Sequence, residues 1–528
     1  MAFYFMHEMT HAALSPWRAV ADMTKLYYKN PFNPVSSTPI GKSLAAGCEV
    51  FERATRQYGK PAFGIEETII DGKTLPVFEE EVWSDTFCKL LNFRRKIPAG
   101  SSLNLSGKAT KVVIVAPMSG HYATLLRGTV EGLLPHHDVY ITDWVDARQV
   151  PVSEGKFDLD DYIDYIISIS HFFEGDVHFV GVCQPSVPVL AAVARMEQEG
   201  DPHAPKSMTL MGGPIDTRVN PTAVNDLASK NDLAWFENNV IMTVPFPNPG
   251  FMRRVYPGFL QLSGFMSMNM DRHVTAQREF YNHLIKDDGE SAEKHREFYD
   301  EYLAVMDLTE EFYLQTVEAV FINHALPMRT LMHRDKHVDT SAIKKVALLT
   351  VEGEKDDISG VGQTEVAHAL CDNLPNNMKV HYMQPSVGHY GVFNGSKFRK
   401  GIRPRITEFV NSFDKPEGTP NASKGNLKTR KPEKSAKRAK PKQTTSTKNA
   451  SLESLLLKKP NGKADDLKKI SGVGPKLEGV LNGLGLFHFD QIAKLSKSQI
   501  EQLDDRLSFK GRIVRDDWIG QAKRLAGA

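Results

Sequence analysis

The chain has 528 residues, a formal net charge of +1 and 41% hydrophobic residues, which is typical of one large globular domain with additions or of two to three domains. Its 4 cysteines are not closely paired, which excludes a disulfide framework and favours a reducing compartment. The first residues have neither a basic segment nor a signal cleavage site, and no run approaches the roughly 20 apolar residues of a membrane span. We therefore expect a cytoplasmic protein without a transmembrane segment.

The first part of the chain contains two different patterns of apolar residues. Residues 1–105 have apolar residues at spacings of three and four and are expected to form a mainly helical N-terminal region. In residues 106–216, short apolar strands alternate with helical stretches. The strands are expected at 111–116, 138–143, 177–182 and 207–212. Such a repeat specifies a doubly wound, mostly parallel sheet.

The strand expected at 177–182 ends in a turn that carries a cysteine. Gly181 precedes Cys183 by two residues, and a helical pattern begins just after it. This is the outline of a nucleophile elbow, the strand-to-helix turn that exposes the nucleophile of α/β-hydrolases, with a thiol in place of the usual serine. The competing interpretation is a small buried hydrophobic residue, which we favour for Cys48, Cys88 and Cys371.

An acid and a histidine follow in the chain order of an α/β-hydrolase. A buried strand at 345–351 leads into a turn in which Asp356 lies three residues after Gly353, so Asp356 is favoured over Asp357. A strand at 378–384 leads into a loop with a Gly-His pair. An imidazole can convert a thiol into a thiolate, and a carboxylate orients the imidazole. We therefore predict a triad of nucleophile, orienting acid and base: Cys183, Asp356 and His389.

Two backbone N–H groups are expected to stabilise the negative charge on the attacked carbonyl oxygen. α/β-Hydrolases take one from the residue after the nucleophile and one from the loop after the first parallel strand. These positions are Gln184 and Ser119. This chemistry requires no metal and no bound cofactor.

One insertion interrupts the predicted α/β core. The strand–helix pattern stops at residues 217–340, which are rich in aromatic residues and Met and are expected to form a helical lid, either lining an apolar substrate surface or packing as the lid's own core. Residues 341–413 return to the α/β pattern and complete the core. The predicted fold is thus an α/β-hydrolase.

The C-terminal part has a different composition. Residues 414–464 are rich in Lys and almost free of large apolar residues, so a basic disordered linker is expected. Residues 465–528 regain helical periodicity and contain Gly472-Val473-Gly474 between two short helices. This pattern predicts a small all-α domain of the helix-hairpin-helix type, whose backbone N–H groups can hold a phosphate.

The motifs GVCQPSVP, VEGEKDDISG and SVGHYGVF resemble those of the intracellular polyhydroxybutyrate depolymerases of bacteria. The resemblance spans roughly residues 1–412. It implies a cytoplasmic enzyme on storage granules that cleaves the esters of poly((R)-3-hydroxybutyrate) through a thioester on Cys183, with water or coenzyme A as the acceptor.

The resemblance leaves alternatives open. Polyhydroxyalkanoate synthases share a Cys-Asp-His triad, but their motif is G-x-C-x-G, whereas Pro185 stands at the last position here. An acyltransferase that builds polymer is therefore the second hypothesis. The tail resembles modules appended to other alphaproteobacterial proteins, and the linker and tail together could tether the chain to DNA or to a granule protein.

Overall fold

The computed structural model describes residues 2–96, 110–268, 270–414, 455–457, 459–462, 464–470, 473–496, 499–500, 502–503, 513 and 518–526. The chain divides into two units, Met1–Arg430 and Lys431–Ala528. Most of the predicted linker lies outside the described residues. No helix in the described ranges is long and apolar enough to cross a lipid bilayer.

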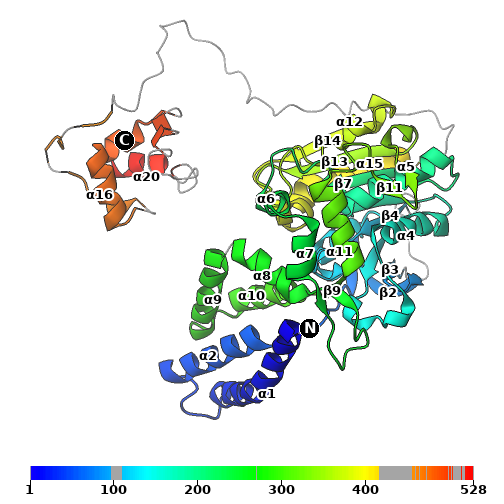
Figure 1. Ribbon diagram of the computed structural model, residues 1–528. Helices are drawn as coiled ribbons and strands as arrows, with labels where there is room; N and C mark the ends of the chain where they lie inside the picture. Colours follow the sequence, from blue (N-terminus) through cyan, green and yellow to red (C-terminus); the bar gives the residue numbers. More distant parts are fainter. Residues whose placement is uncertain are drawn as a thin grey trace, which may run out of the picture. The chain divides into compact units, whose positions relative to one another are not determined.

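The described part of the larger unit is built on a nine-stranded sheet in the order β1-β2-β3-β5-β4-β6-β7-β13-β14 (Figure 1). Its parallel strands are β4 (Lys111–Val115), β5 (Asp138–Trp144), β6 (His178–Val182), β7 (Ser207–Met211), β13 (Ala347–Gly353) and β14 (Lys379–Gln384). Apart from the edge strand β14, these strands are almost wholly buried, because helices cover both faces of a parallel sheet. This is the predicted α/β-hydrolase architecture.

Helices follow the parallel strands as the α/β pattern requires. They include α3 (Arg127–Leu133), α4 (Leu159–Phe172), α5 (Ser186–Glu199), α12 (Ala367–Leu370), α13 (His389–Phe393), α14 (Gly395–Lys397) and α15 (Arg403–Phe413). A short hairpin of β11 (Met332–His333) and β12 (Lys336–His337) stands apart from the main sheet. One continuous apolar core joins the parallel strands to these helices.

The prediction of a mainly helical region at 1–105 is wrong for its second half. The first half forms α1 (Ala2–Lys29) and α2 (Pro39–Thr55). The second half forms the antiparallel strands β1 (Glu67–Ile70), β2 (Lys73–Asp85) and β3 (Cys88–Arg95), and β3 pairs with β5. Asp71 and Gly72 both adopt positive φ, 50° and 77°, as a two-residue hairpin turn between right-twisted strands requires. This Asp-Gly signal was present in the sequence.

Residues 217–340 contain helices, as expected for a lid. These are α6 (Ala223–Lys230), α7 (Leu233–Val240), α8 (Gly258–Met268), α9 (Met270–Ile285), α10 (Gly289–Tyr302) and α11 (Glu310–Thr316). The sequence did not predict a small antiparallel sheet between them, which is formed by β8 (Met242–Thr243), β9 (Arg254–Tyr256) and β10 (Leu308–Thr309). Strands this short carry too few residues to show an alternating pattern.

The described part of the smaller unit is all-helical, as predicted. It contains α16 (Pro475–Leu484), α17 (Phe489–Ala493) and α20 (Trp518–Leu525). These elements share a separate apolar core that includes Leu481, Ile492 and the fully buried Trp518. The predicted turn residue Gly472 lies outside the described residues.

Candidate active site

Cys183 lies at a strained turn between β6 and α5. Its φ is +67°, a left-handed conformation that costs a residue with a side chain roughly 1–2 kcal/mol. The Cys183 N–H donates to the Met211 carbonyl at 2.7 Å, which ties the turn to the neighbouring strand β7. A Cβ on Gly213 would lie 2.9 Å from the Cys183 carbonyl oxygen and 2.0 Å from Ser186 Oγ. The backbone thus has the form of the predicted nucleophile elbow.

The structure brings Asp356 to His389. His389 Nδ1 lies 2.8 Å from Asp356 Oδ2 and 3.1 Å from Oδ1. Asp356 Oδ1 also accepts the N–H groups of Ile358 at 3.0 Å and Ser359 at 2.9 Å, which fix the carboxylate. The side chains of His389 and Asp356 are only 6% and 1% exposed, whereas Asp357 is exposed. Of the two neighbouring acids, Asp356 is therefore the one placed to orient the imidazole.

Opposing effects act on the pKa of His389. Burial alone lowers it, but the negative charges of Cys183 and Asp356, and hydrogen bonds to both side chains, raise the pKa well above 6.5. Since Nδ1 faces Asp356, Nε2 is the nitrogen that remains for Cys183. The surroundings of His389 therefore favour the protonated imidazole.

Gly212, at the end of β7, makes room for this pair. Its φ is +56°, and a Cβ there would lie 3.3 Å from Asp356 Oδ2 and 3.5 Å from His389 Cε1. A side chain at this position would be strained and would press on the Asp–His pair. Sequence reasoning missed Gly212, because its role depends on contacts with loops more than 140 residues away.

The expected oxyanion donors lie beside the nucleophile. Gln184 and Ser119 both border the same cavity as Cys183. The Met118 N–H lies 3.4 Å from Gln184 Oε1, and the Ser119 carbonyl accepts a hydrogen bond from Gln261 of α8. The Met118 N–H thus faces the Gln184 side chain.

A cavity of about 450 Å³ opens over Cys183 and His389. Most of its wall is apolar, and much of the wall comes from the predicted lid. Lid residues on the wall include Leu227, Phe236, Tyr256, Phe265, Phe312 and Tyr313. His121 is also at the wall, and burial lowers its pKa to about 4 although its ring contacts the Tyr302 carbonyl. The cavity is thus lined mainly by apolar side chains, as small-molecule sites usually are.

Two groups of side chains among the described residues have the spacing of metal ligands. They are His171, Asp201 and His203, and Glu352, Glu365 and His381. None of these six residues borders the cavity. They are therefore separate from the residues proposed for catalysis.

Comparison with known proteins assigns the larger unit. Residues 212–414 match the family model described as "PHB de-polymerase C-terminus". This part of the chain is thus similar to PHB depolymerases. The match confirms the resemblance seen in the motifs and includes both Asp356 and His389, whereas Cys183 precedes it. An ester hydrolase is the enzyme class that this match and the α/β-hydrolase architecture support.

The smaller unit matches a different family. Residues 467–526 match the "RS2/RL21/YNQ2 HHH domain". Large ribosomal subunit protein bL21 of Jannaschia sp. (strain CCS1) is 67% identical over 66 residues, which are 12% of this chain and 26% of that protein. Small ribosomal subunit protein uS2 of Methylobacterium sp. (strain 4-46) is 44% identical over 73 residues, which are 14% of this chain and 21% of that protein. The chain thus spans about a quarter of the length of these curated relatives.

Solved structures similar to the chain include hydrolases. A soluble variant of monoglyceride lipase from Saccharomyces cerevisiae is 10% identical with a TM-score of 0.38, over 66% of this chain and 98% of that one. A thermophilic esterase from Thermogutta terrifontis is 12% identical with a TM-score of 0.33, over 66% of this chain and 98% of that one.

Proposed function

We propose that the chain cleaves the ester bonds of poly((R)-3-hydroxybutyrate) granules in the cytoplasm, with Cys183 as nucleophile, His389 as base and Asp356 as orienting acid. The observation that carries the proposal is the Asp356–His389 pair beside an elbow cysteine, at an apolar cavity in a chain whose residues 212–414 match PHB depolymerases. A polyester has no charge, so an apolar cavity suits it.

The first half of the reaction forms a thioester. The Cys183 thiolate attacks the carbonyl carbon of an ester unit, and the resulting oxyanion accepts the N–H of Gln184 and a second N–H from Met118 or Ser119. When the carbon–oxygen bond to the leaving chain breaks, His389 Nε2 gives its proton to the departing alkoxide. A 3-hydroxyacyl group remains on Cys183 Sγ.

The second half releases the acyl group. A water molecule attacks the thioester carbonyl while His389 takes one of its protons, and the collapse of the intermediate frees the carboxylic acid and the Cys183 thiolate. The thiol of coenzyme A can take the place of water, in which case an acyl-CoA leaves. Asp356 keeps the imidazole in one tautomer through both halves. Each proton is carried by His389, so the scheme uses no metal and no bound cofactor.

The test compares wild type with Cys183→Ala on amorphous polyhydroxybutyrate granules, with and without coenzyme A. Soluble 3-hydroxybutyrate and its CoA ester are measured. We expect release by wild type and by the control Cys48→Ala, and none by Cys183→Ala. Release by Cys183→Ala would contradict the mechanism. Polymer formed from 3-hydroxybutyryl-CoA would instead support the synthase.

We also propose that residues 465–528 form a contact module separate from catalysis. The described part has its own apolar core, and its family model also describes a domain of ribosomal proteins. A nucleic acid is the candidate partner, and attraction to phosphates falls steeply with salt. Lys468 pairs with Asp466 and Glu478 at 2.6 and 2.7 Å, which limits its part in such binding. Gel shifts with DNA and RNA over a salt series test this; a shift that is absent or insensitive to salt would exclude it.

A further inference from the structure

The outer face of α1 is apolar along its length. Between Phe3 and Lys29, the charged residues Glu8, Arg18, Asp22 and Lys25 are partly buried, and the exposed Lys29 pairs with Glu49 at 2.6 Å. Nine large apolar side chains of α1 are 50–71% exposed, and the outer face is defined here by six of them that lie on one side of the helix: Phe5, Met6, Met9, Trp17, Val20 and Met23. Soluble monomers rarely expose a continuous apolar surface of this size, and such surfaces mark a binding partner.

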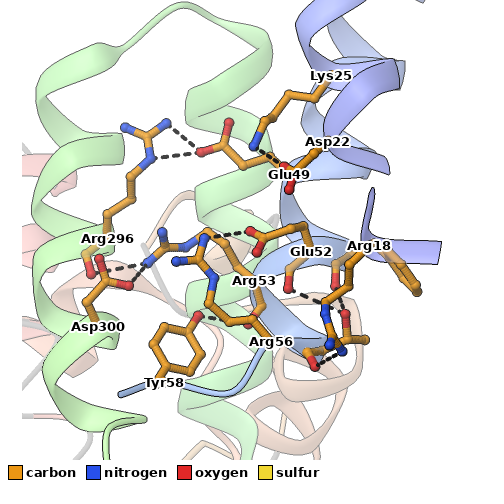
Figure 2. Close-up of polar contacts among 12 residues, drawn as sticks. Arg18, Asp22, Lys25, Glu49, Glu52, Arg53, Arg56, Tyr58, Arg296 and Asp300 are labelled. Atoms are coloured by element: carbon orange, nitrogen blue, oxygen red, sulfur yellow. Dashed lines mark hydrogen bonds and ion pairs between the residues drawn. The ribbon is translucent and has the colours of Figure 1, made fainter. Parts of the chain in front are cut away.

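The other charged groups of α1 are engaged within the larger unit. Arg18 donates to the carbonyls of Thr55 at 2.9 Å and His11 at 3.1 Å, and Lys25 pairs with Asp22 at 2.6 Å (Figure 2). Helices that bind anionic lipid present Lys and Arg to the lipid headgroups. The outer face of α1 lacks such free cations, so its partner is expected to be uncharged.

Ion pairs join the α1–α2 hairpin to the lid. Arg296 of α10 contacts the buried Glu49 carboxylate of α2 at 2.6 Å, and Arg53 of α2 contacts Asp300 of α10 at 2.5 Å. Figure 2 shows these side chains pointing toward one another across the two helices. The hairpin is thereby fixed to the part of the chain that covers the cavity.

The inward side of α1, opposite its outer face, contacts the lid helix α8. The Tyr4 hydroxyl donates to Asp307 at 2.6 Å, and the His7 ring stacks on Phe259 of α8 at 3.8 Å between ring centres. The next turns of α8 carry Gln261 and Phe265, which border the cavity. The helix that carries the outer face therefore packs directly on a helix that walls the active site.

We infer that the outer face of α1 docks on the surface of the insoluble polyester. The inference rests on the proposed function, because that function supplies an apolar, uncharged and extended substrate. Docking through α1 would hold the polymer to a helix that packs on α8, one of the helices that wall the cavity. The burial of apolar side chains from water provides the attraction.

Binding of the full chain to amorphous polymer particles tests the docking face, with Cys183→Ala throughout so that the polymer stays intact. In the test variant, Met9→Glu, Val20→Glu and Met23→Glu place charges on the face. In the matched control, Ile69→Glu, Phe78→Glu and Val152→Glu place charges on exposed apolar residues elsewhere, which are 61%, 52% and 52% exposed. We expect binding weaker by on the order of tenfold or more in the test variant, because charged side chains at an apolar contact must lose water, and little change in the control.

Further measurements show whether polymer, lipid or a second copy of the chain binds the outer face of α1. Trp17 fluorescence should shift to shorter wavelength on polymer, and the shift should vanish in Trp17→Phe. Equal polymer binding by test and control variants would overturn the inference. So would tighter binding to phosphatidylcholine or phosphatidylglycerol vesicles than to polymer, or a dimer that only the test variant disrupts. Circular dichroism and thermal unfolding confirm that both variants are folded.

A dissolved ester distinguishes this inference from the proposed function. With the Cys183 thiol restored, the test variant should lose far more activity on granules than on ethyl 3-hydroxybutyrate. If Cys183-dependent cleavage of both substrates is unaffected by the α1 charges, docking fails and the proposed function stands. If wild type cleaves neither substrate, the proposed function fails.

Discussion

At the residue scale, two neighbouring aspartates have different surroundings. Asp356 is buried and contacts His389, whereas Asp357 is exposed. Asp356→Asn should therefore reduce the rate of ester cleavage about 10³- to 10⁴-fold, because the amide favours the wrong imidazole tautomer. Asp357→Asn is the matched control and should stay within about twofold, as expected for a change outside the reacting groups. Initial rates on a dissolved 3-hydroxybutyrate ester measure both; similar losses in the two variants would argue against the assignment.

The charge on His389 predicts a dependence of stability on pH. Burial lowers the pKa of His389, but Cys183 and Asp356 raise it well above 6.5. A raised pKa contributes stability that is complete below the unfolded value of about 6.5 and is lost as the pH rises through the folded value. Asp356→Asn removes one of the two negative charges that raise the pKa of His389. The free energy of unfolding of this variant should therefore fall less steeply above pH 6.5 than that of wild type. Urea denaturation across pH 5–9 checks this, and identical slopes would be inconsistent with it.

The positions of the proposed catalytic residues could be predicted because each follows a strand. Cys183, Asp356 and His389 lie one, three and five residues after the ends of β6, β13 and β14, where a parallel sheet gathers the loops at one edge. The role of Gly212 could not be predicted. It depends on a distance of 3.3 Å between a Cβ at this position and the distant Asp356 carboxylate, which a local sequence pattern does not encode.

At the scale of elements, one buried carboxylate is part of the contact between the hairpin and the lid. Glu49 is 6% exposed and contacts both Lys29 and Arg296. Glu49→Gln removes the carboxylate that Lys29 and Arg296 share, leaving Arg296 only its pair with the exposed Glu293, and should lower the free energy of unfolding by about 1–3 kcal/mol. The matched control is Glu290→Gln, which breaks an exposed pair with Lys294 and should cost under about 0.5 kcal/mol.

Urea denaturation measures both variants, and hydrogen exchange locates the effect. Amides of α2 and α10 should exchange faster in Glu49→Gln only. If the two variants lose equal stability, the Glu49 contacts do not join the hairpin to the lid.

Strands 67–95 show how a helical interpretation can fail. Residues 39–55 have apolar side chains at helical spacing and form α2. The helical prediction, however, also covers residues 67–95, which form strands. The Asp71-Gly72 turn and the apolar run of β3 were the opposing local signals. That β3 would join the parallel sheet beside β5 is a long-range pairing, which a local pattern does not contain.

At the scale of the whole molecule, the two units have separate cores, so they should unfold separately. Trp518→Ala removes a fully buried side chain from the smaller core, a change that typically costs about 3–5 kcal/mol. In scanning calorimetry this should lower one transition and leave the other unchanged, with ester cleavage intact. A shift of both transitions would mean that the units are coupled.

The proposed mechanism requires Cys183 to carry the acyl group between the two halves of the reaction. Wild type is mixed rapidly with a short oligomer of (R)-3-hydroxybutyrate, quenched in acid and examined by intact-protein and peptide mass spectrometry. The account predicts a hydroxyacyl adduct on the peptide that contains Cys183, which hydroxylamine removes and which Cys183→Ala does not form. Full turnover without an adduct at any quench time, or an adduct on another residue, would contradict it.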